Sequence, residues 1–183
     1  VQAEEVCLKH AHVIVTISEV LKEELLERGV EEDRIVVYPN CIDPGVFDPE
    51  RFTIHELNGL RQKYGIQENA KVATFIGTFG VWHGVDFLAE AIRMMVDTDE
   101  EWLKEHDLHF LLIGDGLKMQ QVRDTLAGEQ YAPFYTLTGL IPQAEAPLHL
   151  AASDILLSPH VANKDGSRFF GSPTKLFEYM AMG

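Results

Sequence analysis

Short apolar runs alternate with helical patterns along most of this chain, and this alternation restricts the fold more than any other feature. Six runs read as strands: residues 11–18, 36–38, 71–76 (KVATFI), 109–113 (HFLLI), 135–138 and 154–159 (DILLSP). The runs at 71–76, 109–113 and 135–138 each end at a glycine, and the helical spacing of apolar residues that follows is clearest over residues 85–95. Hairpin signals are lacking between the runs. We therefore expect an α/β fold, with a Rossmann-like parallel sheet and helices on both faces.

Composition limits the classes of partner and compartment. The chain has 183 residues and a formal net charge of −14, so we expect no nucleic-acid partner. Any phosphate must then be held by a local arrangement of donors. Cys7 and Cys41 form no CxxC pair, which favours a reducing cytoplasm. No apolar run approaches the ~20 residues of a transmembrane helix. A cytoplasmic protein is expected, with attachment to the inner face of the membrane left open.

The last fifteen residues predict a loop that enters a helix and binds a nucleotide. Ser172 suits the N-cap and Pro173 the first helical position. The first free N–H groups and the Lys175 ammonium then offer donors to a phosphate. Glu178 lies one turn further along the same face and suits a pair of hydroxyls. Leu176, Phe177 and Met180 are assigned to the core. The alternative is a surface helix with an ordinary cap.

A second candidate site follows the strand at 71–76. Residues 77–84 (GTFGVWHG) join this strand to the next helix, at the position where parallel α/β domains bind phosphates. Glycines permit close approach of a ligand to the backbone. The pattern is not GxGxxG, so it is weak as a motif. His83 reads equally well as a ligand contact or as a surface histidine.

Residues 160–168 form a polar loop before the final helix. Lys164 and Arg168, with Lys175, are the cations that would offset the acidic background beside a pyrophosphate. Arg168 is the strongest candidate of the loop, because a guanidinium can fork around a phosphate. Solvated surface side chains are the alternative. Neither a metal-ligand cluster nor a nucleophile–base pair is apparent, so we expect no metal and no cofactor, and catalytic residues stay unassigned.

The run SPTKLFEYMAMG at 172–183 resembles the C-terminal motif of retaining GT-B-fold glycosyltransferases of family four. In that family two glutamates lie eight positions apart and contact the donor sugar and the ribose. Glu178 matches the second, whereas Phe170 stands in place of the first. The family also has Arg and Lys where this chain has Thr78 and His83. The resemblance further implies backbone contacts from Leu140 and Ile141 to the nucleobase.

The residue patterns and the resemblance together predict a donor site for a nucleotide-diphosphate sugar. Its members are Gly77, Thr78, Phe79, His83, Leu140, Ile141, Arg168, Phe170, Gly171, Ser172, Thr174, Lys175 and Glu178.

The resemblance implies two domains. Residues 1–43 are expected to be the tail end of an N-terminal GT-B domain plus a linker, and residues 44–183 a truncated C-terminal nucleotide-sugar-binding domain. The missing N-terminal domain is then a partner of the site, and the fragment alone is expected to be inactive.

The implied activity is sugar transfer, with retention, to an unknown acceptor that is a saccharide or a lipid-linked saccharide. A non-catalytic nucleotide-binding module and a GT-B-fold epimerase or phosphorylase are the alternatives.

Overall fold

The computed structural model of this chain describes residues 2–161, 166, 168 and 171–183. Contacts divide the chain into two compact units. The first unit comprises Val1–Ile42 with Ala162–Thr174, and the second comprises Asp43–Val161 with Lys175–Gly183. Each unit has a parallel sheet of its own. The assignment of residues 1–43 and 44–183 to two domains of a larger enzyme stays a prediction.

The first unit contains a two-stranded parallel sheet. Its elements are α1 (Gln2–His10), β1 (Ile14–Thr16), α2 (Glu19–Glu27), the 3-10 turn η1 (Glu32–Arg34) and β2 (Ile35–Val37). The Ser18 hydroxyl caps α2 by accepting a hydrogen bond from the Leu21 N–H at 3.2 Å. The Arg34 guanidinium donates to the carbonyls of Leu8 and Ala11, which fastens the end of α1 to this unit.

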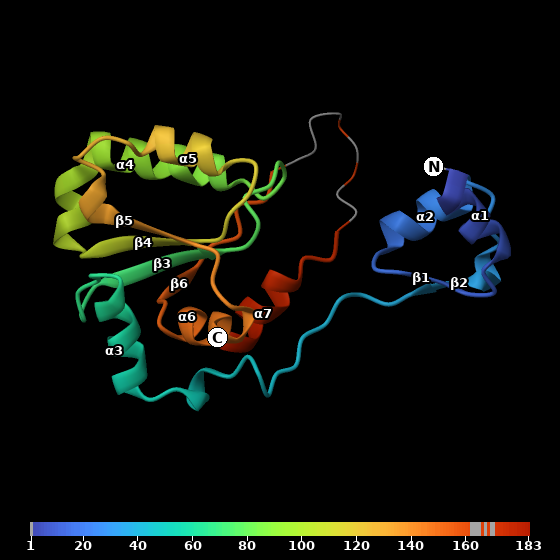
Figure 1. The fold of residues 1–183 in the computed structure, drawn as a ribbon, viewed down its shortest axis with the longest axis horizontal. Helices are drawn as coiled ribbons and strands as arrows, with labels where there is room; N and C mark the ends of the chain where they lie inside the picture. Colours follow the sequence, from blue (N-terminus) through green and yellow to red (C-terminus); the bar gives the residue numbers. More distant parts are fainter. Residues whose placement is uncertain (1, 162–165, 167, 169–170) are drawn as a thin grey trace. The chain divides into compact units, whose positions relative to one another are not determined.

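The second unit is an α/β domain with four parallel strands in the order β5-β4-β3-β6 (Figure 1). Its strands are β3 (Lys71–Ile76), β4 (Leu108–Ile113), β5 (Tyr135–Gly139) and β6 (Ile155–Leu156). Its helices are α3 (Ile54–Lys63), α4 (Val85–Glu105), α5 (Met119–Thr125), α6 (Ala146–Ala151) and α7 (Thr174–Met182). The 3-10 turns are η2 (Pro49–Arg51), η3 (Ala132–Phe134) and η4 (Gln143–Glu145). The predicted parallel sheet is confirmed.

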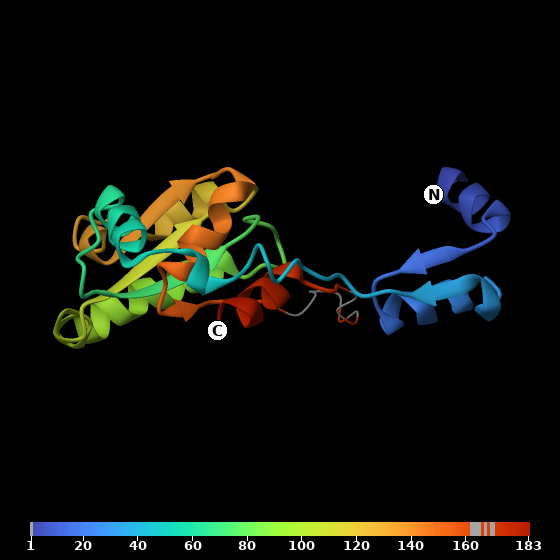
Figure 2. The same ribbon diagram turned by 90° about the horizontal axis from the view of Figure 1, so that it is seen from below.

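Helices cover both faces of this sheet, as predicted. Figures 1 and 2 show α4 and α5 on one face and α3, α6 and α7 on the other. Successive side chains of a strand point to opposite faces. Phe75 and Leu112 accordingly join the core beneath α4 and α5, whereas Val72 and Leu111 join the core on the α3 side. A rigid two-faced core of this kind fixes the loops at the carboxyl ends of the strands.

The face that α7 buries differs from the predicted one. Lys175, Tyr179 and Met182 are its buried residues, whereas Leu176 is 40% exposed and Met180 70% exposed. Apolar residues surround most of this helix, so their spacing does not single out one face. The Tyr179 hydroxyl accepts a hydrogen bond from the Ile76 N–H at 3.3 Å, which anchors α7 to the end of β3.

The start of α7 also lies later than predicted. The helix begins at Thr174, so Pro173 precedes it. The Ser172 hydroxyl accepts a hydrogen bond from the Asn40 N–H at 3.2 Å, and the Asn40 side-chain amide donates to the Ser172 carbonyl at 2.6 Å. Ser172 therefore connects two segments of the first unit.

Candidate functional site

Three tight backbone approaches hold the carboxyl edge of the second-unit sheet together. The Gly77 N–H, at the end of β3, donates to the Ile113 carbonyl at 3.0 Å. A Cβ on Gly114 would lie 1.9 Å from the Gly77 carbonyl oxygen, and Gly114 has a φ of +136°. A Cβ on Gly84 would lie 1.6 Å from the carbonyl oxygen of Pro159. Glycine is required at these crossings, so the loop that joins β3 to α4 lies close to the loops after β4 and β6.

Lys175 brings a buried cation to this edge. It lies in the first turn of α7, and its side chain lies over the Phe75 ring, with Nζ 4.2 Å from the ring centroid. A Cβ on Gly77 would lie 3.0 Å from Nζ, so the missing side chain of this glycine leaves room for the ammonium. Lys175 is only 8% exposed, and no described residue accepts a hydrogen bond from its Nζ.

Burial of an ammonium without an acceptor is costly. It lowers the pKa of Lys175 from 10.5 to about 8, and the charge of Glu178 acts in the opposite direction. A shift of this size corresponds to a cost of about 3 kcal/mol for the charged form. Buried charges without a partner persist chiefly where a ligand supplies the missing hydrogen-bond acceptor. The ammonium of Lys175 therefore marks a candidate ligand site.

Two histidines from different loops lie within electrostatic reach of this lysine. His83 belongs to the loop after β3 and His160 to the segment after β6, and their ring centroids are 5.8 Å apart. Nδ1 of His83 is buried and has no hydrogen-bond partner among the described residues, whereas Nδ1 of His160 meets the Ser158 hydroxyl at 2.9 Å. Burial, and next the charge of Lys175, lower the pKa of both histidines.

Glu178 provides an acceptor one turn along α7. Its side chain is half-buried, and burial raises the pKa of the carboxyl group, an effect that the charge of Lys175 opposes. Within the described part of the chain, no hydrogen bond or ion pair occupies this carboxylate. Its i, i+3 relation to Lys175 places a cation and an acceptor on one helical face, as predicted.

The turn after β5 presents a different environment. The pairing of β4 with β5 shifts after Leu112, so that Ile113 lies opposite Gly139. Such bulges re-aim the chain at the rims of sheets. Leu140, which follows, is 77% exposed, whereas the side chain of Ile141 packs against the α3-side core.

Two predicted residues of the β3–α4 loop differ in what they offer to a ligand. Thr78 is exposed. Phe79 is fully buried in the core, its N–H donates to the Asp115 carbonyl at 2.9 Å, and its carbonyl accepts from the Lys118 N–H at 2.9 Å. Phe79 therefore anchors the loop in the core and offers no exposed side chain to a ligand.

Gly171, Ser172 and Arg168 fall in the first unit, and the Arg168 guanidinium forms an ion pair with Glu23 of α2. Thr174 is the first residue of α7 and the last residue that the contacts assign to the first unit. Phe170 and Lys164 lie outside the described residues.

His160 is the residue that the pattern of predicted elements could have indicated. It follows the strand β6, which pairs in parallel with β3, so both carboxyl ends meet at one edge of the sheet.

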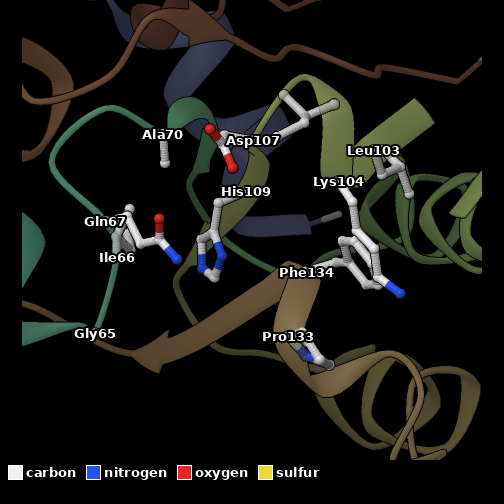
Figure 3. A pocket seen from close by; sticks show the side chains of 11 residues that line it. Gly65, Ile66, Gln67, Ala70, Leu103, Lys104, Asp107, His109, Pro133 and Phe134 are labelled. Carbon is white, nitrogen blue, oxygen red and sulfur yellow. The ribbon is translucent and has the colours of Figure 1, made fainter. Parts of the chain in front are cut away.

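A separate hollow of about 230 Å³ lies at the opposite end of the same strands. Figure 3 shows His109 within it, between Gln67 and Phe134. Nε2 of His109 lies 2.9 Å from the Thr136 hydroxyl, and its pKa is lowered by burial. This histidine already has a hydrogen-bond partner within the fold. The hollow therefore differs from the carboxyl edge, where buried nitrogen atoms have no described partner.

A family comparison identifies the chain. Residues 70–183 match the model of a family described as Glycosyl transferases group 1. This match spans more than half of the chain. The chain belongs to that family.

Relatives of this group 1 glycosyl transferase carry related names. The 2-deoxystreptamine glucosyltransferase of Streptomyces kanamyceticus is 28% identical over 87% of the chain and 39% of its own length. The putative colanic acid biosynthesis glycosyl transferase WcaI of Escherichia coli K12 is 24% identical over 93% of the chain and 38% of its own length. The chain thus spans well under half the length of these two relatives.

Solved structures show the same fold. A glycosyltransferase of Rickettsia africae ESF-5 superposes with a TM-score of 0.71 at 21% identity, over 97% of this chain and 46% of its own. Anabaena HepE, solved in complex with UDP-glucose, gives a TM-score of 0.67 at 17% identity, over 97% and 44%. The second unit thus has the Rossmann-like fold of GT-B glycosyltransferase C-terminal domains.

Among the described residues of this glycosyl transferase chain, none of the helices is both long and apolar enough to cross a lipid bilayer. Nor do the described residues contain a group of three or more His, Cys, Asp or Glu side chains placed to hold a metal ion.

Proposed function

We propose that the protein transfers a sugar from a nucleotide-diphosphate donor to an acceptor, with retention at the anomeric carbon. The observation that carries this proposal is the ammonium of Lys175, which is buried at the carboxyl edge without an acceptor among the described residues. A diphosphate supplies the acceptors that this ammonium lacks, and family membership indicates which class of ligand carries the diphosphate.

The ligand is proposed to lie along the carboxyl edge. Lys175 and His83 face the diphosphate, and the carboxylate of Glu178 accepts the two ribose hydroxyls. The bulged turn at Leu140 and Ile141 contacts the base through its backbone. Anabaena HepE, which shares this fold, was solved with UDP-glucose, and this supports a nucleotide-sugar donor of the same class.

The chain's own residues contribute electrostatic stabilisation to the proposed reaction. As the bond between the sugar and the diphosphate breaks, negative charge grows on the departing diphosphate. A fixed ammonium in a water-poor site stabilises that charge more strongly than it would in bulk water. Acid–base groups and the acceptor site are assigned to an N-terminal domain of the full-length protein. The acceptor is proposed to be a saccharide or a lipid-linked saccharide.

This proposal accounts for the two departures from the family-four pattern in the β3–α4 loop. Thr78 and His83 stand where the pattern has Arg and Lys. Lys175 enters the same region from α7, in the space left by the absent side chain of Gly77. The site therefore has a cation near the diphosphate, although its β3–α4 loop lacks the Arg and Lys of the family-four pattern.

Turnover by the full-length protein tests the activity. Nucleotide-diphosphate sugars with different bases and sugars are incubated with saccharide and lipid-linked saccharide acceptors, and the anomeric configuration of each product is determined. We expect one donor class to be consumed only in the presence of acceptor, with retention. Tight nucleotide binding without any turnover would support the non-catalytic module instead, and conversion of the donor without acceptor would support an epimerase.

A further inference from the structure

The carboxyl edge carries three nitrogen bases from three different elements. His83 comes from the β3–α4 loop, His160 from the segment after β6 and Lys175 from α7. The two imidazole rings lie 5.8 Å apart, and the charge of Lys175 acts on both of them. We refer to these three residues as the base cluster.

Few neighbouring charges compensate the base cluster. Glu178 is the carboxylate whose charge acts on Lys175. Asp86, in the first turn of α4, is held by the ammonium of Lys118 at 2.9 Å. The Ser158 hydroxyl faces His160. Asp86 Oδ1 is buried and has no hydrogen-bond partner among the described residues. The cluster brings up to three positive charges to one place, and each proton that it takes up repels the next.

Repulsion and burial both disfavour protonation of this cluster in the absence of a ligand. Burial lowers the pKa of all three members, and the lysine charge lowers those of the two histidines further. A bound diphosphate brings at least two negative charges and several acceptor oxygens to the same place. Its charge favours the protonated form of every member.

We propose that His83, His160 and Lys175 bind the donor diphosphate together and take up protons as it binds, which makes His160 a donor-binding residue. This inference rests on the proposed function of the same edge. It differs from a site built on arginines, because a guanidinium is always charged and exchanges no proton on binding.

Calorimetric titration tests the inference directly. The full-length protein is titrated with UDP, GDP, ADP and dTDP at pH 8, in two buffers that differ in ionisation enthalpy. The terminal phosphate of a nucleoside diphosphate is fully ionised at this pH, since its last pKa is about 6. The difference in heat between the buffers therefore counts protons taken up by the protein. We expect net uptake with the tightest-binding diphosphate and none with the matching nucleoside.

The pH dependence of affinity gives a second readout. Uptake of half a proton to one proton strengthens diphosphate binding by roughly threefold to tenfold for each unit that the pH falls between 9 and 7. In His160→Gln and His83→Gln, both the uptake and this pH dependence should shrink. His109→Gln is the matched control, because the pKa of His109 is also lowered by burial but its ring lies at the opposite end of the strands.

The outcomes separate the inference from the function on which it rests. Diphosphate binding without proton uptake, or with a pH dependence that His160→Gln leaves intact, would overturn the inference and leave the donor site standing. If none of the four diphosphates binds more tightly than its nucleoside, the proposed function fails together with the inference.

Discussion

At the scale of single residues, Lys175 shows a conflict between folding and ligand binding. Its ammonium is held over Phe75 with no acceptor among the described residues, at a cost that a ligand would offset. We therefore expect Lys175→Met to raise the free energy of unfolding by about 1–3 kcal/mol at pH 7, because methionine fills similar space without a charge. Urea unfolding of both proteins measures this change. A loss of stability would mean that the ammonium has a partner in the fold.

The pH dependence of this difference has a definite sign. The lowered pKa of Lys175, about 8 compared with 10.5, means that the unfolded chain binds more protons between these two values. The stability of the wild type should therefore rise with pH across that window, whereas the methionine variant lacks this contribution. The advantage of Lys175→Met should be largest at pH 7 and shrink towards pH 10. An advantage that is independent of pH would contradict the assigned burial.

Glu178 allows a test that concerns the ribose alone. Glu178→Gln keeps the size of the side chain but weakens the acceptor, so donor binding should weaken by about 1–3 kcal/mol, with little change in stability. Compared with the ribonucleotide, a 2′,3′-dideoxy nucleotide should bind the wild type more weakly by a similar free energy. The variant should bind the two nucleotides almost equally well. If the dideoxy form binds the wild type as well as the ribonucleotide does, the ribose assignment is wrong.

At the scale of elements, the crossing of Gly84 and Pro159 holds two loops of the site together. Gly84 has a φ of +70°, and a Cβ there would lie 1.6 Å from a backbone carbonyl. We expect Gly84→Ala to lower the free energy of unfolding by at least about 2 kcal/mol. Alanine is strained at this positive φ, and its Cβ would clash with the backbone carbonyl.

The matched control for this substitution lies in α3. A Cβ on Gly59 meets nothing within 4 Å, so Gly59→Ala should raise the free energy of unfolding by about 0.5–1 kcal/mol through helix propensity. Thermal unfolding of both variants measures the difference. Equal effects at the two glycines would show that the loop yields to the added methyl group.

The strands β3, β4 and β5 could be predicted from the sequence to within one residue, whereas β6 comprises only Ile155–Leu156 of the predicted strand 154–159. The predicted strand 71–76 coincides with β3, because a buried parallel strand is apolar on both faces. The orientation of α7 could not be predicted. Its apolar residues surround the helix, and the contacts that decide which face is buried, Lys175 over Phe75 and Tyr179 at Ile76, join distant segments.

The candidate site was predictable in part for the same reason. Lys175 and Glu178 lie on one short helix, and their spacing alone places them together. His160 is distant in sequence from His83, and only the pairing of β6 with β3 makes them neighbours. Arg168 has the residue type for a phosphate contact, but it forms an ion pair with Glu23, which no local pattern indicates.

At the scale of the whole molecule, this chain spans under half the length of the two relatives compared above, although it contains the proposed donor site. A GT-B active site lies between two domains, so we expect residues 1–183 by themselves to bind a nucleotide-diphosphate sugar without transferring the sugar. Incubation with donor and acceptor, compared with the full-length protein, tests this expectation. Transfer by residues 1–183 alone would contradict the assignment of residues 44–183 to one domain of a two-domain enzyme.

The central claim is that the carboxyl edge of the second-unit sheet binds the diphosphate of a nucleotide through Lys175. The most direct measurement compares the affinities of a nucleoside and its diphosphate for the wild type and for Lys175→Met. We predict that the diphosphate group strengthens binding to the wild type, and that the variant loses roughly 1.5–3 kcal/mol of diphosphate affinity while its nucleoside affinity is unchanged. Equal losses for the two ligands, or no loss for either, would contradict the claim.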